Sequence, residues 1–497
     1  MGTAGGSGDA LHVAVVHGYF LQDSGSAVYV RELSRALVAL GHDVTLVCQD
    51  REPERCDFID SVYELDEANQ ELTLLDQHRP RSHDGACRLV RPNLSGDLLV
   101  YIEGAFPPFE DSRVRAFQNA SPQLRDRYVA RNIAALSTTF ARWMPDVVLA
   151  QHLIMQPYVV RAALDGRAPY MVTEHGSALN FSVRANAELV PFALEGLAGA
   201  SRVAAVSEAA RDDLVAWAEA LGCPIGSKTE TMPAGIDSGL FSVANDRTEA
   251  IAALKSCVEL PDGFDIGPHD DIIAFGGSLR PTKGIQHLIA ATGLMPDRPG
   301  RRLRLLIAGD GPARPALEAL AALVACGDTS GAAALAASEP LLASPPEWGA
   351  IVPQEPVHRG DASTAFLGHI DHGQLARVFA AADVCVTPSV FPEAGPLVSI
   401  EAQSAGSVAV ASHHGVLAAL NDTMAEALTD PAFTALLPGS ELTSGLAVLL
   451  GHILDTYPTN DAAFRRTMRA LALDRYPSWE EAAERYVAMA REPAGCD

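Results

Sequence analysis

The sequence predicts two doubly wound α/β domains in one chain. Short apolar runs, which are typical of buried parallel strands, alternate with segments whose apolar residues recur at helical spacing. The chain has 497 residues, of which 48% are hydrophobic and 20% are charged, so it can bury a substantial core and is too apolar to be disordered. For this length, average domain sizes favour two large α/β domains or about three smaller ones.

The first domain is expected over residues 1–235. Its strands are predicted from apolar runs at 11–17, 44–48, 147–151, 170–173 and 203–206. The first helix is predicted at 27–40, because its apolar residues fall on one helical face. This order of strand, helix and strand indicates a parallel, Rossmann-like sheet. Residues 50–110 break the alternation, and we interpret them as an insertion.

The second domain is expected over residues 236–476. Its strands are predicted from apolar runs at 272–276, 303–308, 365–367, 384–387 and 408–411. A helix is predicted at 284–293, after the first of these strands. Residues 327–360, rich in Ala, Ser and Pro, are interpreted as a second insertion, a loop with one short helix. The segment 477–492 is predicted to be an amphipathic helix anchored by Trp479.

The charge of the chain limits its partners. Lys and Arg number 37 and Asp and Glu number 62, which gives a net charge of −25 at pH 7. So acidic a protein repels phosphate backbones and anionic lipid, so we expect no nucleic-acid partner and consider membrane association disfavoured. Residues 113–142 are locally basic. A solvated helical face is the favoured interpretation, and the alternatives are a patch that docks on lipid and a pocket for an anionic acceptor.

The cysteines and the N-terminus bear on location. The eight cysteines include no Cys-x-x-Cys pair, so neither a zinc ribbon nor a thioredoxin-type site is expected. The Gly-rich N-terminus lacks the basic region of a signal peptide, and no apolar run reaches the roughly 18 residues that would span a membrane. We therefore expect a cytoplasmic protein, and a homo-oligomer is left open.

The strongest candidate for a binding motif directly follows the fourth strand of the second domain. It reads Pro-Ser-Val-Phe-Pro-Glu-Ala-Gly-Pro-Leu over residues 388–397. Pro396 suits the first turn of a helix, where its missing N–H would have no partner in any case. The free N–H groups of Ala394, Gly395 and Leu397 would then form an anion site at the helix N-terminus. Since ligands of open parallel sheets bind beyond the carboxyl ends of the strands, we expect the site in a cleft between the domains.

Two carboxylates accompany this motif. Glu393 lies on the loop before the expected helix, and Glu401 lies about one turn into it. In this arrangement both can accept hydrogen bonds from a polyhydroxyl ligand. Two solvated glutamates on surface turns are the plainer interpretation, and the surrounding turn and proline favour the binding role.

Several blocks of the sequence resemble, in order, those of retaining GT-B glycosyltransferases, in particular glycosyltransferase family 4. Residues 393–401 resemble the Glu-x7-Glu signature of that family. Other matching blocks are Pro-Asp-Val-Val at 145–148, Thr-Glu-His-Gly at 173–176, Ala-Val-Ser-Glu at 205–208, Met-Pro-Ala-Gly-Ile-Asp at 232–237 and Ile-Ala-Gly-Asp-Gly-Pro at 307–312. The resemblance implies a GT-B fold, with two Rossmann-like domains facing a central cleft and the C-terminal helix, in 477–497, crossing back onto the first domain.

The resemblance also implies a nucleotide sugar as co-substrate on the C-terminal domain. Glu401 would hold the ribose hydroxyls of the nucleotide, and Glu393 would hold hydroxyls of the donor sugar. The amides that follow Glu393 would cradle the sugar and the diphosphate, with Gly277 and Ser278 also on the donor side.

On the N-terminal domain the resemblance implies a small-molecule acceptor. His175 would lie near the transferred sugar, and a hydrogen-bonded turn histidine is the alternative interpretation. Gly25 matches the glycine turn at the start of the family's first helix. Ser26 stands where the family usually has a second glycine.

Two cations are expected to neutralise the leaving diphosphate. Lys283 matches the family's lysine, and its place at a helix start, unfavourable for a cation, favours a ligand role. The family arginine usually found four to five residues earlier is replaced here by Ser278, so we predict that Arg280 supplies the second charge; a solvent-facing arginine is the alternative. Because the chain contains no Asp-x-Asp motif, these cations and a helix N-terminus would act in place of a metal, and no metal or other cofactor is predicted.

The predicted function is therefore retaining, metal-independent sugar transfer from an NDP-sugar to a small molecule, in antibiotic or other specialised-metabolite biosynthesis or in glycoconjugate biosynthesis. Two alternatives stay open: transfer to an unusual nitrogen or sulfur acceptor, and a non-catalytic protein that binds the sugar nucleotide. The motifs leave the base, the sugar and the acceptor open.

Overall fold

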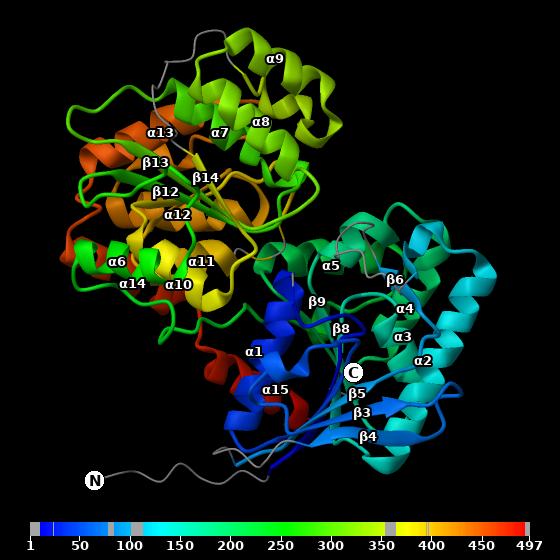
Figure 1. Cartoon of the computed structure of the whole chain (residues 1–497). Coiled ribbons are helices and arrows are strands. Elements are labelled where there is room, and N and C mark those ends of the chain that lie inside the picture. Colours follow the sequence, from blue (N-terminus) through cyan, green and yellow to red (C-terminus); the bar gives the residue numbers. More distant parts are fainter. Residues whose placement is uncertain are drawn as a thin grey trace, which may run out of the picture. The chain divides into compact units, whose positions relative to one another are not determined.

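The computed structural model describes residues 10–22, 24–77, 84–100, 113–352, 364–393, 395 and 397–492. The chain divides into two compact units, both of α/β type (Figure 1). The N-terminal unit comprises Met1–Gly235 together with Trp479–Asp497, and the C-terminal unit comprises Ile236–Ser478. The chain therefore returns to its first unit at the end.

The N-terminal unit has a nine-stranded sheet with the order β11-β10-β9-β8-β1-β2-β5-β3-β4. The strands are β1 (His12–Val16), β2 (Asp43–Val47), β3 (Ser61–Leu65), β4 (Leu72–Gln77), β5 (Cys87–Arg91), β8 (Val147–Gln151), β9 (Tyr170–Glu174), β10 (Arg202–Ala205) and β11 (Thr229–Thr231). All of them pair in parallel except β4, which is antiparallel to β3. A separate parallel pair is formed by β6 (Asp97–Val100) and β7 (Arg113–Ala116).

The predicted insertion at 50–110 is not a loop in its described part. It adds β3, β4 and β5 to the edge of the sheet. Polar residues interrupt all three strands, such as Glu64 in β3, Thr73 in β4 and Arg88 in β5, so none contains the continuous apolar run that predicts a buried strand. The five strands predicted in this unit are confirmed.

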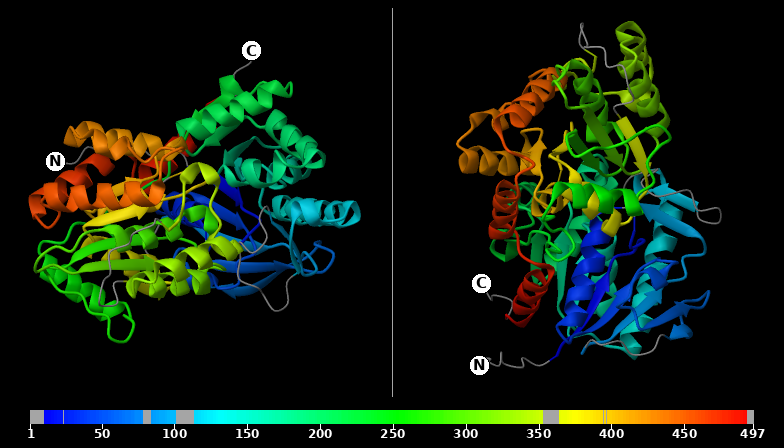
Figure 2. Two further views of the ribbon diagram at one scale, coloured as in Figure 1. Left: turned by 90° about the horizontal axis from the view of Figure 1, so that it is seen from above. Right: turned by 60° about the vertical axis from the view of Figure 1, so that its left-hand side comes forward.

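Helices cover both faces of this sheet. They are α1 (Gly25–Ala39), α2 (Pro122–Arg142), α3 (Gln156–Leu164), α4 (Val190–Gly199), α5 (Glu208–Ala220) and α15 (Trp479–Arg491). Figure 1 shows α1 and α15 on one face and α2, α3 and α4 on the other. In the right-hand view of Figure 2, α15 (red) again lies beside α1 (blue), consistent with the contacts between the two helices. The predicted return of the C-terminal helix is confirmed.

The C-terminal unit has a five-stranded parallel sheet with the order β14-β13-β12-β15-β16. The strands are β12 (Asp271–Gly276), β13 (Leu303–Ala308), β14 (Thr364–Gly368), β15 (Val384–Thr387) and β16 (Val408–Ala411). The helices are α6 (Arg247–Cys257), α7 (Ile285–Leu294), α8 (Arg314–Ala325), α9 (Thr329–Ser338), α10 (His372–Ala381), α11 (Leu397–Ser404), α12 (Gly415–Leu428), α13 (Leu442–Thr456) and α14 (Ala462–Arg475). In Figure 1, α7, α8 and α13 lie on one face of the sheet and α6, α10, α11 and α14 on the other.

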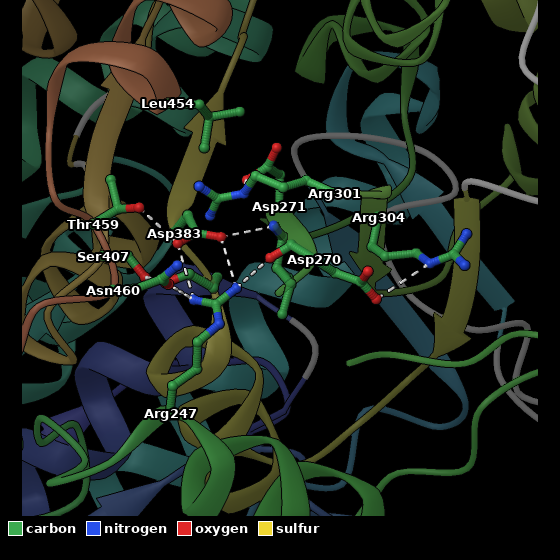
Figure 3. Close-up of polar contacts among 12 residues, drawn as sticks. Arg247, Asp270, Asp271, Arg301, Arg304, Asp383, Ser407, Leu454, Thr459 and Asn460 are labelled. Carbon is green, nitrogen blue, oxygen red and sulfur yellow. Dashed lines mark hydrogen bonds and ion pairs between the residues drawn. The ribbon is translucent and has the colours of Figure 1, made fainter. Parts of the chain in front are cut away.

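At the amino ends of these strands, buried acids and arginines form an ion-pair network (Figure 3). Arg247 of α6 donates to both carboxylate oxygens of Asp383, each at 2.9 Å. Asp383 also accepts the N–H of Ile272 at 2.7 Å, and Asp270 lies 3.7 Å from Arg304. These acids are therefore satisfied inside the fold, at the end of the sheet opposite to the expected site.

Candidate functional site

Three loops follow the carboxyl ends of β12, β13 and β15, and they pack against each other through glycines. Gly309 has φ +133°, and a Cβ there would lie 1.9 Å from the carbonyl oxygen of Gly277. Gly284 has φ +68°, and a Cβ there would lie 1.8 Å from the carbonyl oxygen of Pro388. Because only glycine permits these approaches, the loop after β12 reaches the loop after β15.

This contact brings together two residues predicted for catalysis. Lys283 Nζ lies 2.6 Å from Glu393 Oε1, and Ser389 Oγ donates to the same oxygen. Burial alone would raise the pKa of Glu393, but the ammonium of Lys283, the hydrogen bonds and nearby His414 lower that pKa overall. Glu393 is therefore a carboxylate paired with an ammonium, and the pair stays accessible, with side chains 20% and 30% exposed.

Ser389, which the sequence motif contains but to which no role was assigned, contributes to the site. Its carbonyl oxygen accepts a hydrogen bond from His414 Nε2 at 2.8 Å, and its hydroxyl orients Glu393. His414 comes from the loop after β16 and belongs to none of the sequence blocks considered.

Glu401 lies one turn into α11 and is only 4% exposed. Its Oε1 lies 3.4 Å from Nε2 of His372, the first residue of α10. Gly395 is half-buried just before α11, which begins at Leu397. Ala394 and Pro396 lie outside the described residues, so the anion site at this helix start stays a prediction.

Arg280 has the extended backbone (φ −129°, ψ 152°) expected of a residue before proline. Its side chain is half-buried, and burial lowers its pKa. Its carbonyl oxygen accepts the N–H of Lys283 at 3.0 Å, so the two cations share one tight turn. Ser278 is also half-buried there, whereas the N–H of Gly277 is used by the carbonyl of Ala308.

In the N-terminal unit, a histidine directly follows each of the three neighbouring strands β1, β8 and β9. His17 and His152 have ring centroids 5.1 Å apart, and those of His152 and His175 are 5.0 Å apart. Burial lowers the pKa of His17 to about 4, that of His175 to about 3 and that of His152 well below its usual value. All three imidazoles are therefore neutral at pH 7.

The buried imidazole of His175 is oriented by two neighbours. Its Nε2 lies 2.9 Å from Oε1 of Gln151, the last residue of β8. A carbonyl oxygen only accepts, so Nε2 carries the proton and Nδ1 is left as an acceptor. The ring of Tyr29 packs edge to face on the His175 ring, with 5.1 Å between the ring centroids. Beside it, burial raises the pKa of Glu174 to about 7.

The sequence analysis found His175 but missed His17, His152, Gln151 and Tyr29. A signal was available, because His17 ends one predicted strand and Gln151 ends another. The predicted topology, however, did not fix the neighbour order of these strands.

The predicted acceptor residues lie at the start of α1. Gly25 is exposed, and a Cβ built on it would have no neighbour within 4 Å. Ser26 Oγ lies 3.2 Å from Oγ of Ser24, which caps the helix by accepting the N–H of Ala27 at 3.1 Å. The two residues therefore lie in the first turn of α1, where no other part of the chain that the structure describes packs on Gly25.

A cavity of about 380 Å³ opens in the same unit, near the carboxyl ends of β2 and β5. Its lining includes Phe20, Gln49, Arg51, Glu64, Arg91 and Asn93. Arg91 Nε is held by the carbonyl oxygen of Asp50 at 2.6 Å. Phe20 joins the cavity to the histidines, because its carbonyl oxygen accepts from His17 Nε2 at 3.0 Å.

In the basic stretch 113–142, Arg115, Arg127 and Arg142 are exposed, which fits the favoured interpretation of a solvated face. Arg125 is buried and pairs with Glu188 at 2.7 Å, and Arg127 pairs with Asp97 at 3.0 Å. Arg125 is thus the buried exception in a stretch whose other described arginine side chains are exposed or half-buried.

Within the part of the chain that the structure describes, no group of three or more His, Cys, Asp or Glu side chains is arranged to hold a metal ion. None of the helices in that part is both long and apolar enough to cross a membrane.

Comparison with known proteins identifies the family. Residues 24–220 match the family described as glycosyl transferase 4-like domain, and residues 350–436 match glycosyl transferases group 1. The second match contains both Glu393 and Glu401. The two matched regions together span more than half of the chain. The chain belongs to the family 4-like, group 1 glycosyltransferases.

Curated relatives of this glycosyltransferase include proteins named D-inositol 3-phosphate glycosyltransferase. The one from Nocardia farcinica is 32% identical over 220 residues, which are 44% of this chain and 40% of that protein. The one from Corynebacterium glutamicum is 32% identical over 184 residues, 37% of this chain and 35% of that protein. The match therefore covers about two fifths of the relatives' own length.

Solved structures share the fold. Sucrose-phosphate synthase from Thermosynechococcus elongatus has a TM-score of 0.63 at 20% identity, covering 97% of this chain and 98% of that one. HepE from Anabaena, in complex with UDP and glucose, has a TM-score of 0.60 at 14% identity, covering 97% of this chain and 100% of that one. The predicted fold class, two Rossmann-like α/β domains of GT-B type, is confirmed.

Proposed function

We propose that this glycosyltransferase moves a sugar from an NDP-sugar to an anionic small molecule, with retention of configuration and without a metal. The observation that supports this most is the Lys283–Glu393 pair at the carboxyl edge of the C-terminal sheet, with Glu401 buried on the following helix. It combines a cation for a diphosphate with two carboxylates for hydroxyl groups, in the order of the matched family.

In this proposal Lys283 stabilises the charge that develops on the leaving nucleoside diphosphate. Glu393 holds the ammonium in place at 2.6 Å and offers its second oxygen to the donor sugar. The anomeric carbon becomes oxocarbenium-like, and the departing phosphate oxygen assists attack from the same face, which preserves configuration. Arg280 would add the second cation.

Metal independence rests on these cations and on the absence of an Asp-x-Asp motif from the sequence. We expect turnover to survive EDTA at a concentration that removes free Mg²⁺ and Mn²⁺. Complete loss of turnover on chelation, restored by either ion, would overturn this part of the proposal.

The anionic acceptor is supported by the cavity of the N-terminal unit, whose lining includes Arg51 and Arg91 together with polar residues and the acids Glu64 and Asp97. The curated relatives are named for an inositol phosphate, which has this chemistry. A phosphorylated or carboxylated polyol is therefore the acceptor class to test first, in a cytoplasmic biosynthetic pathway of glycoconjugates or specialised metabolites.

The first experiment is a thermal-shift screen with UDP, GDP, ADP and dTDP. A nucleotide at 100 times its dissociation constant stabilises the protein by about 2.7 kcal/mol. The matching NDP-sugars are then tested for hydrolysis and for transfer to inositol phosphate, with unphosphorylated inositol as the control. Binding without any turnover would favour a non-catalytic sugar-nucleotide protein, and no binding of any nucleotide would overturn the proposal.

A further inference from the structure

The C-terminal helix α15 places a tyrosine hydroxyl inside the N-terminal unit. Tyr486 is buried, and its OH lies 3.0 Å from the OH of Tyr29 on α1 and 3.0 Å from Oγ1 of Thr173 on β9. The OH of Tyr29 in turn donates to the carbonyl oxygen of Met232 at 3.3 Å. Four segments far apart in the sequence thus share one chain of hydrogen bonds.

The direction of this chain follows from counting protons. Tyr29 uses its only hydroxyl proton on the carbonyl of Met232, so its oxygen accepts from Tyr486. Tyr486 has then used its own proton and accepts from Thr173. Each of the three hydroxyls therefore donates one hydrogen bond, and the two tyrosine hydroxyls also accept one each, which gives the chain a single arrangement.

The same chain holds the surroundings of His175. The ring of Tyr29 lies between two others: Trp479 contacts it edge to face at 5.3 Å, and His175 does so at 5.1 Å. Thr173 lies on β9, and His175 directly follows the end of that strand. The C-terminal helix therefore contacts both the strand that carries His175 and the aromatic ring that packs on it.

We propose that Tyr486 is a positioning residue for His175, acting through Tyr29 and Thr173, so that the C-terminal helix completes the N-terminal half of the active site. This inference rests on the proposed function for the role of His175 in turnover. In it, Tyr486 touches no substrate; it restricts Tyr29 to one position and thereby fixes the imidazole between Tyr29 and Gln151.

The test is Tyr486→Phe, which keeps the ring and removes the hydroxyl. Small misplacements of a catalytic group cost up to about 10²-fold in rate, so we expect kcat to fall roughly 10- to 100-fold. The KM for the NDP-sugar is expected to stay unchanged, because the predicted donor residues lie in the other unit. Thr173→Val, which removes the first donor of the chain, is expected to shift kcat in the same direction by less.

A matched control is Tyr170→Phe. Tyr170 is also buried, starts the same strand β9, and its OH donates to the carbonyl of Gly196 at 2.6 Å. Its loss removes a comparable hydrogen bond at the end of the strand away from His175. A general loss of stability would lower kcat equally in both variants, whereas the proposal predicts loss in Tyr486→Phe alone.

A second readout does not depend on turnover. In protein labelled with ¹⁵N-histidine, the ring signals of His175, assigned by their absence in His175→Gln, should show one tautomer protonated at Nε2. Tyr486→Phe should broaden or average these signals, and Tyr170→Phe should leave them as in the parent.

The outcomes separate the two proposals. Unchanged His175 signals in Tyr486→Phe, or a kcat equal to that of Tyr170→Phe, would overturn the positioning role. A parent protein that turns over no NDP-sugar would overturn the proposed function instead, and the histidine signals would still decide whether Tyr486 orients the ring.

Discussion

The two ends of the C-terminal sheet use charged side chains in opposite ways. At the amino ends of the strands, Asp383 is buried. Its carboxylate accepts hydrogen bonds from both terminal nitrogens of Arg247 and from the hydroxyl of Thr459. At the carboxyl ends, Glu393 and Lys283 form a pair that stays partly open to solvent. Both carboxylate oxygens of Asp383 are bonded within the fold, whereas the Lys283–Glu393 pair retains exposed polar atoms that a ligand can reach.

The backbone at the carboxyl ends of the strands is also suited to binding. Around the open pair the loops approach so closely that glycines stand at positive φ, as at Gly284 and Gly309. Such positions leave room for backbone and ligand rather than for side chains. From this comparison we predict that the amino ends serve stability and the carboxyl ends serve binding, which the following four experiments test.

The largest effect is expected at the closed network. Asp383→Ala leaves the guanidinium of Arg247 buried without its carboxylate, so the free energy of unfolding should fall by about 3–5 kcal/mol. Urea denaturation measures it. The control is Asp455→Ala, which removes a partner of Arg298 that is 68% exposed and should change stability by less than about 0.5 kcal/mol. Equal effects in the two variants would contradict the structural role of the network.

At the open end, turnover should suffer rather than stability. Lys283→Ala and Arg280→Ala are each expected to lower kcat by roughly 10²–10³-fold, the effect of losing one electrostatic donor in the transition state. Steady-state kinetics on both variants measures this. If Arg280→Ala turns over like the parent while Lys283→Ala is inactive, the second cation lies elsewhere.

The histidines at the carboxyl end of the N-terminal sheet are held neutral by burial, which predicts acid sensitivity. Their pKa values in the folded protein lie below the usual 6.5, so as the pH falls these histidines take up protons in the unfolded chain first. The free energy of unfolding that burial of the neutral rings contributes above pH 6.5 is therefore lost toward pH 4. For His17 alone this amounts to about 3 kcal/mol, from its pKa of about 4.

The matched variant is His17→Gln, compared with the parent by urea unfolding between pH 7.5 and pH 4.5. The raised pKa of Glu174, about 7, acts in the opposite sense between roughly pH 4.5 and 7, and it is common to both proteins. The parent should therefore lose more stability than the variant as the pH falls. Parallel curves would show that His17 is not held neutral.

The smallest of the four effects is expected for donor binding. Glu401→Ala removes a buried carboxylate that would accept the ribose hydroxyls, so nucleotide affinity should fall by about 1.5–3 kcal/mol, the range for a hydrogen bond to a charged group. Calorimetric titration of the preferred nucleotide measures it. Unchanged affinity in the folded variant would remove Glu401 from the site.

Much of the fold could be predicted from the sequence where strands are buried on both faces. The apolar runs at 147–151, 303–308, 384–387 and 408–411 have the same bounds in the structure, because parallel strands that are buried on both faces are mostly apolar. The edge strand β4 could not be found in this way, since Thr73, Asp76 and Gln77 leave it without a continuous apolar run.

The candidate site divides similarly. Local motifs identified Lys283 and Glu393, and the structure joins them because Gly284 allows the two loops to meet. The contact between His17 and His152 depends on strands 135 residues apart in the chain, so no local pattern contains it. The role of Arg280 and of the amides before α11 stays a prediction.

The pairing of Tyr29 with Tyr486 has a consequence for synthesis. The two residues are 457 positions apart, and translation adds roughly 5–20 residues per second. The interval between the synthesis of Tyr29 and that of Tyr486 is therefore about 20 to 90 seconds, and the whole C-terminal unit is synthesised within it. During that time α1 lacks the helix that packs against it in the finished fold, so the buried residues between α1 and α15 acquire their partners last.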